Sequence, residues 1–142
     1  TTSIGGLGMM PVQTSYILSK HAMLSFSECL RLEMLVKRAP IQVSAVLPGP
    51  VATRIFEDSP PGTDPMVAHH REVMRAMLEK DGITGLEAAR RILKQIAAGE
   101  FWVSTHPEIT AQMAQARAAY LAAQSMPQLP PGIEQMLGDG AP

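Results

Sequence analysis

Blocks of apolar and polar positions predict helices and short buried strands in turn. From Ser15 to Lys37, apolar side chains recur at helical spacing and cover more than half of the helical wheel. Lys20 and Glu28 lie among the polar side chains on the remaining face. A helix that packs against a sheet on one side only needs a narrower apolar stripe than this. The pattern therefore predicts a helix buried on two sides, against a core and against a partner.

The stretch IQVSAVL, Ile41 to Leu47, is β-rich and mostly apolar, and the prolines of Pro48–Pro50 end it. A helix, a short turn and a buried strand are typical of a parallel sheet. Thr1–Ile4 is predicted to be the end of another strand, before the Gly-rich turn GGLGMMP.

The second half of the chain alternates in the same way. Thr84 and Glu87 have the spacing of a helix capping box. The predicted elements are a loop over Arg54–Pro65, a helix over Met66–Lys80, a helix after Thr84 that ends at Gly99, a strand over Phe101–Thr105 and a helix over Pro107–Ala123.

This order predicts an α/β fold. A parallel sheet of about three strands leaves unpaired edges, so we expect the C-terminal part of a larger Rossmann-like, doubly wound sheet. Residues 1–124 are predicted to belong to this domain and residues 125–142, rich in proline, to a coil tail.

Composition narrows the classes of function. The chain has 142 residues, 46% hydrophobic and 18% charged, with net charge −1, which favours a single globular domain without nucleic-acid or membrane-surface partners. Cys29 is the only cysteine, so no internal disulfide forms. The uncharged start, Thr1–Ser19, is interrupted by glycine and proline and resembles neither a membrane span nor a signal peptide. We expect a cytoplasmic protein.

Tyr16 and Lys20 are four residues apart, so both side chains can reach one point beside the helix. A phenol ionises near about pH 10, and a neighbouring ammonium favours the phenolate, which suits proton transfer at neutral pH. An ordinary helix start with a solvated lysine explains the pair as well, and for the pair alone it is the better explanation.

Two further features support the chemical interpretation. Ser3 precedes the Gly-rich turn at the predicted strand end, where its hydroxyl can hold a substrate oxygen beside the phenol. LPGPVATRI follows the next strand, at the edge of a parallel sheet where ligands bind. Taken alone, Pro48, Gly49 and Pro50 could simply end a strand.

Together these residues resemble the short-chain dehydrogenases/reductases. The matching stretches are TTSIGGLG with Ser3, SYILSKHAMLSFSECLRLE with Tyr16 and Lys20, IQVSAVLPGPVATRI, and FWVSTHPE. The resemblance implies an oxidoreductase that transfers a hydride between NAD or NADP and a carbonyl or secondary alcohol. It implies that Tyr16 is the general acid/base and that Ser3 positions the substrate oxygen.

The resemblance also implies cofactor contacts. Lys20 would assist Tyr16 and bind the nicotinamide ribose, and the backbone of Pro48, Gly49 and Val51 would line the nicotinamide. The hydroxyl of Thr53 would contact the carboxamide or the phosphates. The family's Gly-rich dinucleotide turn, cofactor selector and NNAG-like strand end do not occur here. We therefore expect the C-terminal portion of a longer enzyme, inactive by itself.

Arg54–Gly82 would be the substrate lid, with an apolar wall that suits an apolar substrate. Family resemblance and the doubly apolar helix together suggest a homodimer or homotetramer. His69 and His70 are predicted to be solvated residues at a helix start, and His106 lacks partners at metal-binding spacing, so we predict no metal site. A non-catalytic binding or regulatory subunit of the same fold is the alternative, and epimerase, dehydratase and isomerase activities also occur in the family.

Overall fold

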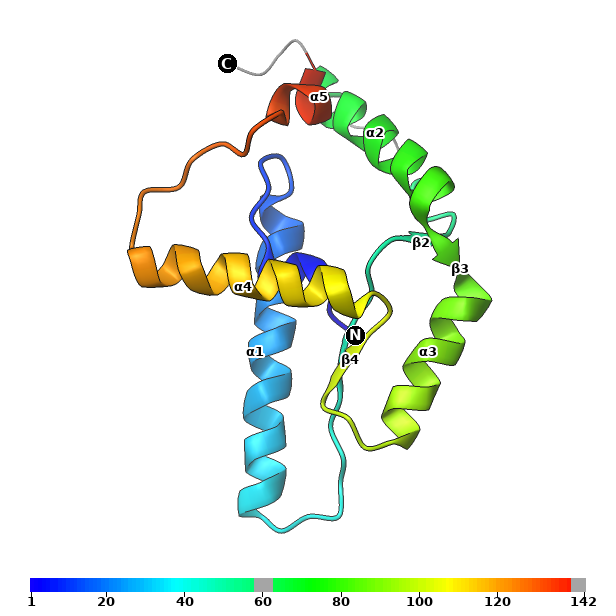
Figure 1. Ribbon diagram of the computed structural model, residues 1–142, viewed down its shortest axis with the longest axis vertical. Coiled ribbons are helices and arrows are strands. Elements are labelled where there is room, and N and C mark those ends of the chain that lie inside the picture. Colours follow the sequence, from blue (N-terminus) through cyan, green and yellow to red (C-terminus); the bar gives the residue numbers. More distant parts are fainter. Residues whose placement is uncertain (58–62, 139–142) are drawn as a thin grey trace.

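The computed structural model describes residues 1–57 and 63–138 (Figure 1). Its strands form two parallel pairs, β1 with β4 and β2 with β3. Helices separate the partners along the chain, as parallel pairing requires. The α/β fold class is therefore confirmed. The strands are β1 (Ala45–Leu47), β2 (Val51–Ala52), β3 (Ile83–Thr84) and β4 (Trp102–Ser104).

The long helices begin and end within about two residues of the sequence prediction. Asp64 caps α2 by accepting from the Met66 N–H at 2.8 Å, and Thr84 caps α3 by accepting from the Glu87 N–H at 3.2 Å. The helices are η1 (Ile4–Leu7, a 3₁₀ turn), α1 (Thr14–Val36), α2 (Pro65–Asp81), α3 (Gly85–Ala97), α4 (Pro107–Ala123) and α5 (Ile133–Leu137).

The first residues run extended beside β1 without completing a strand. The Thr2 N–H donates to the Val46 carbonyl at 2.8 Å, and the Ile4 N–H donates to the Pro48 carbonyl at 3.1 Å. In a parallel ladder the backbone N–H of residue 48 would bond back to Thr2, but proline has none. The predicted strand end at Thr1–Ile4 therefore becomes an extended segment that enters η1.

Strand β1 is shorter than predicted because Ile41–Ser44 have no ladder partner. On β4 the pairing begins with Trp102, and the residues before it form the turn that follows α3, in which Gly99 has φ +82°. Strands β2 and β3 were not predicted. Each has two residues, which is too few for a periodic pattern.

A small core lies between α1 and the β1–β4 pair. Leu24 packs with Ala45 and Leu47, and the partly buried Ile4, Leu7 and Phe101 surround them. Leu47 and Val103 are fully buried. On β4, Trp102 packs edge-to-face against Phe101 with ring centroids 5.3 Å apart and is 49% exposed. The middle of α1 is thus packed against β1.

The second apolar side of α1 is exposed in this chain. Only Leu24 of the helix is buried. The exposed apolar side chains are Leu18, Met23, Phe26, Leu32, Leu35 and Val36. Burial of this side against a partner stays a prediction.

The predicted coil over residues 125–142 is wrong for Ile133–Leu137, which form α5. Ile133 and Leu137 are each 3% exposed, and α5 packs against α2 (Figure 1). Proline and glycine before the helix suggested coil, but tertiary packing stabilises a helix too short to form alone. Residues 139–142 and 58–62, which include the predicted Pro60, Pro61 and Gly62 of the loop, lie outside the described residues.

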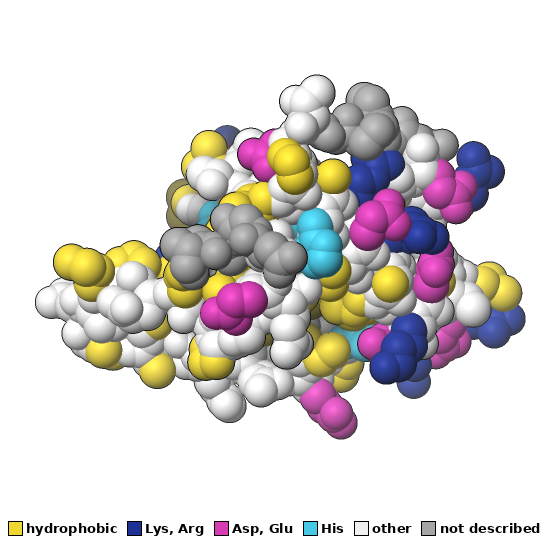
Figure 2. Space-filling model, turned by 90° about the horizontal axis from the view of Figure 1, so that it is seen from above, with side chains coloured by type: hydrophobic (Ala, Val, Ile, Leu, Met, Phe, Trp, Pro, Cys, Tyr) yellow, Lys and Arg dark blue, Asp and Glu magenta, His cyan; other side chains and the backbone are white. Residues whose placement is uncertain are grey.

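Two surface properties concern possible partners. On the face seen from above, acidic and basic side chains lie next to one another, mainly on the right of the view (Figure 2). A mixed surface of this kind gives no broad field of one sign. Within the described residues, no helix has the length and apolar character needed to cross a membrane.

Candidate functional site

Ser3 and Tyr16 both lie close to Gly5. A Cβ placed on Gly5 would be 3.0 Å from Tyr16 Cε1 and 3.5 Å from Ser3 Oγ. The two side chains are therefore near neighbours beside a residue that has no side chain. Ser3 Oγ also accepts from the Gly5 N–H at 3.0 Å, which fixes the serine as the cap of η1.

Lys20 lies beside Tyr16 on the same face of α1. Its Nζ is 5.5 Å from the centroid of the Tyr16 ring, within the range of a cation–π contact. Tyr16 is 41% exposed, so a ligand can reach it, while Lys20 is half-buried. We call Ser3, Gly5, Tyr16 and Lys20 the N-terminal cluster.

Thr2 and Gly6 join the first segment to α1. Thr2 is 4% exposed, and its hydroxyl donates to the Lys20 carbonyl at 2.7 Å. A Cβ on Gly6 would be 2.9 Å from that same carbonyl oxygen, so only glycine allows the backbones to approach so closely. These two contacts position Ser3 beside the first turns of α1, and sequence reasoning had assigned neither residue a role.

The Pro48–Pro50 turn, with Val51 after it, continues from β1 next to this cluster. The Pro48 carbonyl accepts from Ile4, the residue after Ser3, and the Pro50 carbonyl accepts from the Ile83 N–H at 3.2 Å. The predicted substrate and nicotinamide residues Ser3, Pro48 and Gly49 are thus linked through backbone hydrogen bonds.

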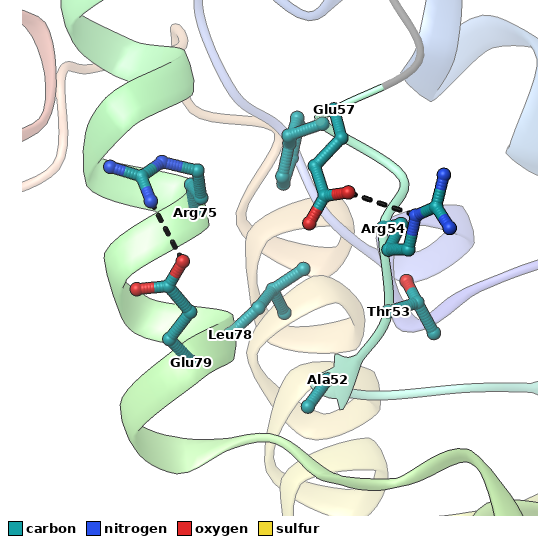
Figure 3. A pocket seen from close by; sticks show the side chains of 8 residues that line it. Ala52, Thr53, Arg54, Glu57, Arg75, Leu78 and Glu79 are labelled. Atoms are coloured by element: carbon teal, nitrogen blue, oxygen red, sulfur yellow. Dashed lines mark hydrogen bonds and ion pairs between the residues drawn. The ribbon is translucent and has the colours of Figure 1, made fainter.

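Thr53 is exposed and lines a separate hollow of about 260 Å³ between β2 and α2 (Figure 3). Arg54 and Glu57 form an ion pair of 2.9 Å on one side, and Arg75 and Glu79 form one of 2.8 Å on α2. We call this the lid hollow, because it lies in the predicted lid, Arg54–Gly82. The lining residues are Ala52, Thr53, Arg54, Phe56, Glu57, Arg75, Leu78 and Glu79.

The start of α1 also contacts α2 through His70. Its Nε2 lies 2.7 Å from Nε2 of Gln13, the residue that precedes α1. His70 is 5% exposed, and burial is the main reason that its pKa is lowered; the charge of His69 lowers it further and the Met136 backbone partly offsets both. The neutral imidazole therefore accepts from the Gln13 amide. The sequence marked His70 as a solvated helix-start residue, which is wrong.

His106 was likewise considered only as a metal ligand. In the described part of the chain, no group of three or more His, Cys, Asp and Glu side chains is arranged to hold a metal ion. His106 instead packs against Gly49, and its Nδ1 is 2.8 Å from Thr105 Oγ1. No local pattern in the sequence indicates this contact, because it depends on the pairing of β1 with β4.

Comparison with known proteins agrees with the sequence resemblance. Residues 1–64 match the short chain dehydrogenase family. Two curated relatives, each named putative oxidoreductase SadH and from Mycobacterium tuberculosis strains CDC 1551 / Oshkosh and ATCC 25618 / H37Rv, are 43% identical over 58 residues. No solved structure matches the chain. The N-terminal region of this chain is therefore similar to the short-chain dehydrogenases.

The match has a limited extent. The aligned residues make up 41% of this chain and 21% of each relative, so the chain spans about a fifth of the length of the curated relatives it matches. The family match includes both the N-terminal cluster and the turn after β1, but neither comparison assigns a role to a residue.

Proposed function

We propose that the protein is an NAD(P)-dependent oxidoreductase that interconverts a carbonyl compound and a secondary alcohol. The observation that carries the proposal is that Ser3 and Tyr16 both lie beside Gly5 and that Lys20 lies over the Tyr16 ring. It brings two side chains with hydroxyl groups and one with an ammonium group close to one another. The family match and the name of the curated relatives support the same class of reaction.

The proposed roles follow from the chemistry of the three side chains. Tyr16 donates its phenolic proton to the carbonyl oxygen during reduction and takes a proton from the alcohol during oxidation. Ser3 donates a hydrogen bond to the same oxygen and holds it beside the phenol. The ammonium of Lys20 stabilises the phenolate that remains.

NAD or NADP supplies or accepts the hydride when it is bound. The donor set fits the nicotinamide end of such a molecule, because Lys20 can bond ribose hydroxyls and the turn offers backbone groups. In this proposal Pro48, Gly49 and Val51 line the nicotinamide and Thr53 reaches its carboxamide or the phosphates. The two parallel strand pairs then form part of a Rossmann-like, doubly wound sheet.

The proposal extends to substrate and assembly. The predicted lid presents Phe56, Met66 and Val67 as partly buried apolar side chains, which suits an apolar carbonyl compound. The exposed apolar side of α1 is the surface on which a second copy would pack in a homodimer or homotetramer.

The test uses protein expressed from its complete native reading frame. Oxidation of NADH and of NADPH is followed with a panel of aliphatic and aromatic aldehydes and ketones, and the reverse reaction with the matching alcohols. Turnover that depends on Tyr16 supports the proposal. Cofactor binding without turnover of any member, together with an unchanged cellular role in the Tyr16→Phe variant, would favour a non-catalytic subunit of the same fold.

A further inference from the structure

The Pro48–Pro50 turn has a single backbone donor. Pro48 and Pro50 have no N–H, so Gly49 provides the only one. It donates to the side-chain oxygen Oγ1 of Thr105 at 2.9 Å. The β1–β4 ladder ends with the pair Leu47 and Ser104, so this side-chain bond continues the connection between the two chain segments beyond the sheet.

The hydroxyl of Thr105 accepts one hydrogen bond and donates another, and its surroundings determine which partner has which role. Thr105 is fully buried, and its oxygen already accepts from Gly49. The hydroxyl has one proton, and Nδ1 of His106 lies 2.8 Å away. Only an unprotonated Nδ1 gives this buried proton an acceptor. The series therefore runs from the Gly49 N–H to Thr105 and from the Thr105 hydroxyl to a neutral His106 that carries its proton on Nε2.

The ring of His106 also packs directly on the turn. A Cβ on Gly49 would be 2.5 Å from Nδ1 of His106 and 2.9 Å from its Cγ. Contacts that short do not occur, so the turn and the ring determine each other's position. Any side chain at position 49 would displace the imidazole.

The end of β4 is itself held firmly by α3. Arg91 donates from Nη1 to the Thr105 carbonyl at 2.8 Å. The Gln95 amide bonds both the N–H and the carbonyl of Ser104, at 2.9 and 2.8 Å. Thr105 and His106 thus project from a fixed strand end onto the turn.

The electrostatic surroundings favour neutral His106. Burial lowers its pKa most, and the positive charge of Arg91 lowers it further. On α3, Arg91 is also paired with Glu87 at 2.7 Å. On α4, the charged residue nearest in sequence is the exposed Glu108, and the Pro48–Pro50 turn has no charged side chain.

From these contacts we infer that Thr105 and His106 are positioning residues, which hold the Pro48–Pro50 turn in the shape that receives the nicotinamide ring. The inference rests on the proposed function. Both residues act through Gly49, so their effect belongs to the nicotinamide half of the cofactor. They lie more than forty residues beyond the segment that matches the family.

The experiment compares Thr105→Val, which removes the hydroxyl at nearly constant shape, with Thr105→Ser, which keeps it. Calorimetry on protein from the complete native reading frame measures the Kd of NAD⁺ and NADP⁺. ADP-ribose, or its 2′-phosphate for NADP⁺, provides the matched ligand without nicotinamide. We expect Thr105→Val to raise the cofactor Kd about five- to tenfold and to leave that of the matched ligand unchanged. Thr105→Ser should restore binding.

The pH dependence gives a second test that does not need the valine variant to fold. The ratio of cofactor Kd to matched-ligand Kd should rise as pH falls through the lowered pKa of His106. His106→Asn keeps an acceptor close to the place of Nδ1 and cannot titrate, so its ratio should stay flat.

Three results would overturn the inference. They are an unchanged cofactor Kd in Thr105→Val, an equal rise for ADP-ribose, or the same pH profile in wild type and His106→Asn. If the wild-type protein binds neither dinucleotide more tightly than its matched ligand, the proposed function is wrong. The inference, which rests on that function, is then wrong too. Turnover with normal Kd values in the variants would instead refute the inference alone.

Discussion

The N-terminal cluster and the lid hollow are held together by different kinds of contact. Around the cluster, the contacts are buried and involve the backbone, as in the bond from Thr2 to the Lys20 carbonyl. Around the hollow they are ion pairs between exposed side chains, as between Arg75 and Glu79. Buried contacts need particular residues at particular places, whereas exposed ion pairs contribute little to stability. The cluster should therefore respond strongly to small substitutions and the hollow weakly.

The largest effect is expected from Tyr16→Phe. Loss of the phenolic proton should reduce turnover about 10²- to 10⁴-fold, the usual range for a general acid, with little change in the Kd of the cofactor. Tyr120, the only other tyrosine, lies on α4 beside Arg117 and provides the control. Tyr120→Phe should retain full activity. More than a tenth of wild-type turnover in Tyr16→Phe would remove the tyrosine from its proposed role.

A smaller effect, on stability, is expected from Gly6→Ala. The new Cβ would be 2.8 Å from Thr2 Oγ1 and 2.9 Å from the Lys20 carbonyl oxygen, so the first segment must move away from α1. The free energy of unfolding in urea should fall by about 1–3 kcal/mol. Gly85 is the control, because a Cβ there meets nothing within 4 Å. Gly85→Ala should be neutral or slightly stabilising, and equal losses in both variants would contradict the close approach.

Two histidines predict how stability depends on pH. The pKa values of His70 and His106 are both lowered from 6.5, with burial as the main cause. The unfolded chain then binds more protons than the folded chain below about pH 6.5. The stability that these residues contribute is complete above that pH and is lost as pH falls through their folded pKa values. Urea midpoints between about pH 8 and 5 measure the slope.

The double variant His70→Gln, His106→Asn is the control for that slope. Neither new side chain titrates, so the stability of this variant should change less between neutral and acidic pH than that of the wild type. Identical slopes would show that the two imidazoles are not held neutral. The result would also test the link between the start of α1 and α2, because Gln13 bonds the neutral form of His70.

The smallest effect is expected at the lid hollow. Glu79→Gln removes one partner of Arg75, but Glu72 remains paired with it at 2.9 Å and all three side chains are exposed. The free energy of unfolding should not change measurably, with or without added salt. Glu87→Gln is the comparison, because its partner Arg91 also bonds the Thr105 carbonyl. A larger loss in Glu79→Gln than in Glu87→Gln would contradict the view that the ion pairs of the lid hollow contribute little to stability.

Sequence reasoning worked best where a local pattern determines the local structure. Thr84 before Glu87 and Pro107 before an apolar run predicted where α3 and α4 begin. The spacing of Ser3, Tyr16 and Lys20 identified side chains that the fold brings together, with Ser3 and Tyr16 beside Gly5 and Lys20 beside Tyr16. Their catalytic roles stay predictions.

The remaining features depend on partners far away in the chain. α5 exists because Ile133 and Leu137 pack on α2, and nothing near them in the sequence indicates that contact. Thr105 and Gly49 are 56 residues apart and meet only because β1 and β4 pair. Their contact could not be read from either segment alone, since it depends on the register of the two strands.

The single tryptophan gives the β1–β4 pair an optical signal of its own. Trp102 is half-exposed at the first position of β4, opposite Ala45 of β1, with its indole against the edge of Phe101. Emission excited selectively from indole therefore originates from one strand pair and from no other part of the molecule. Separation of these strands would move the emission to longer wavelength, so a fluorometer can follow the opening of the scaffold beneath the turn without any added label.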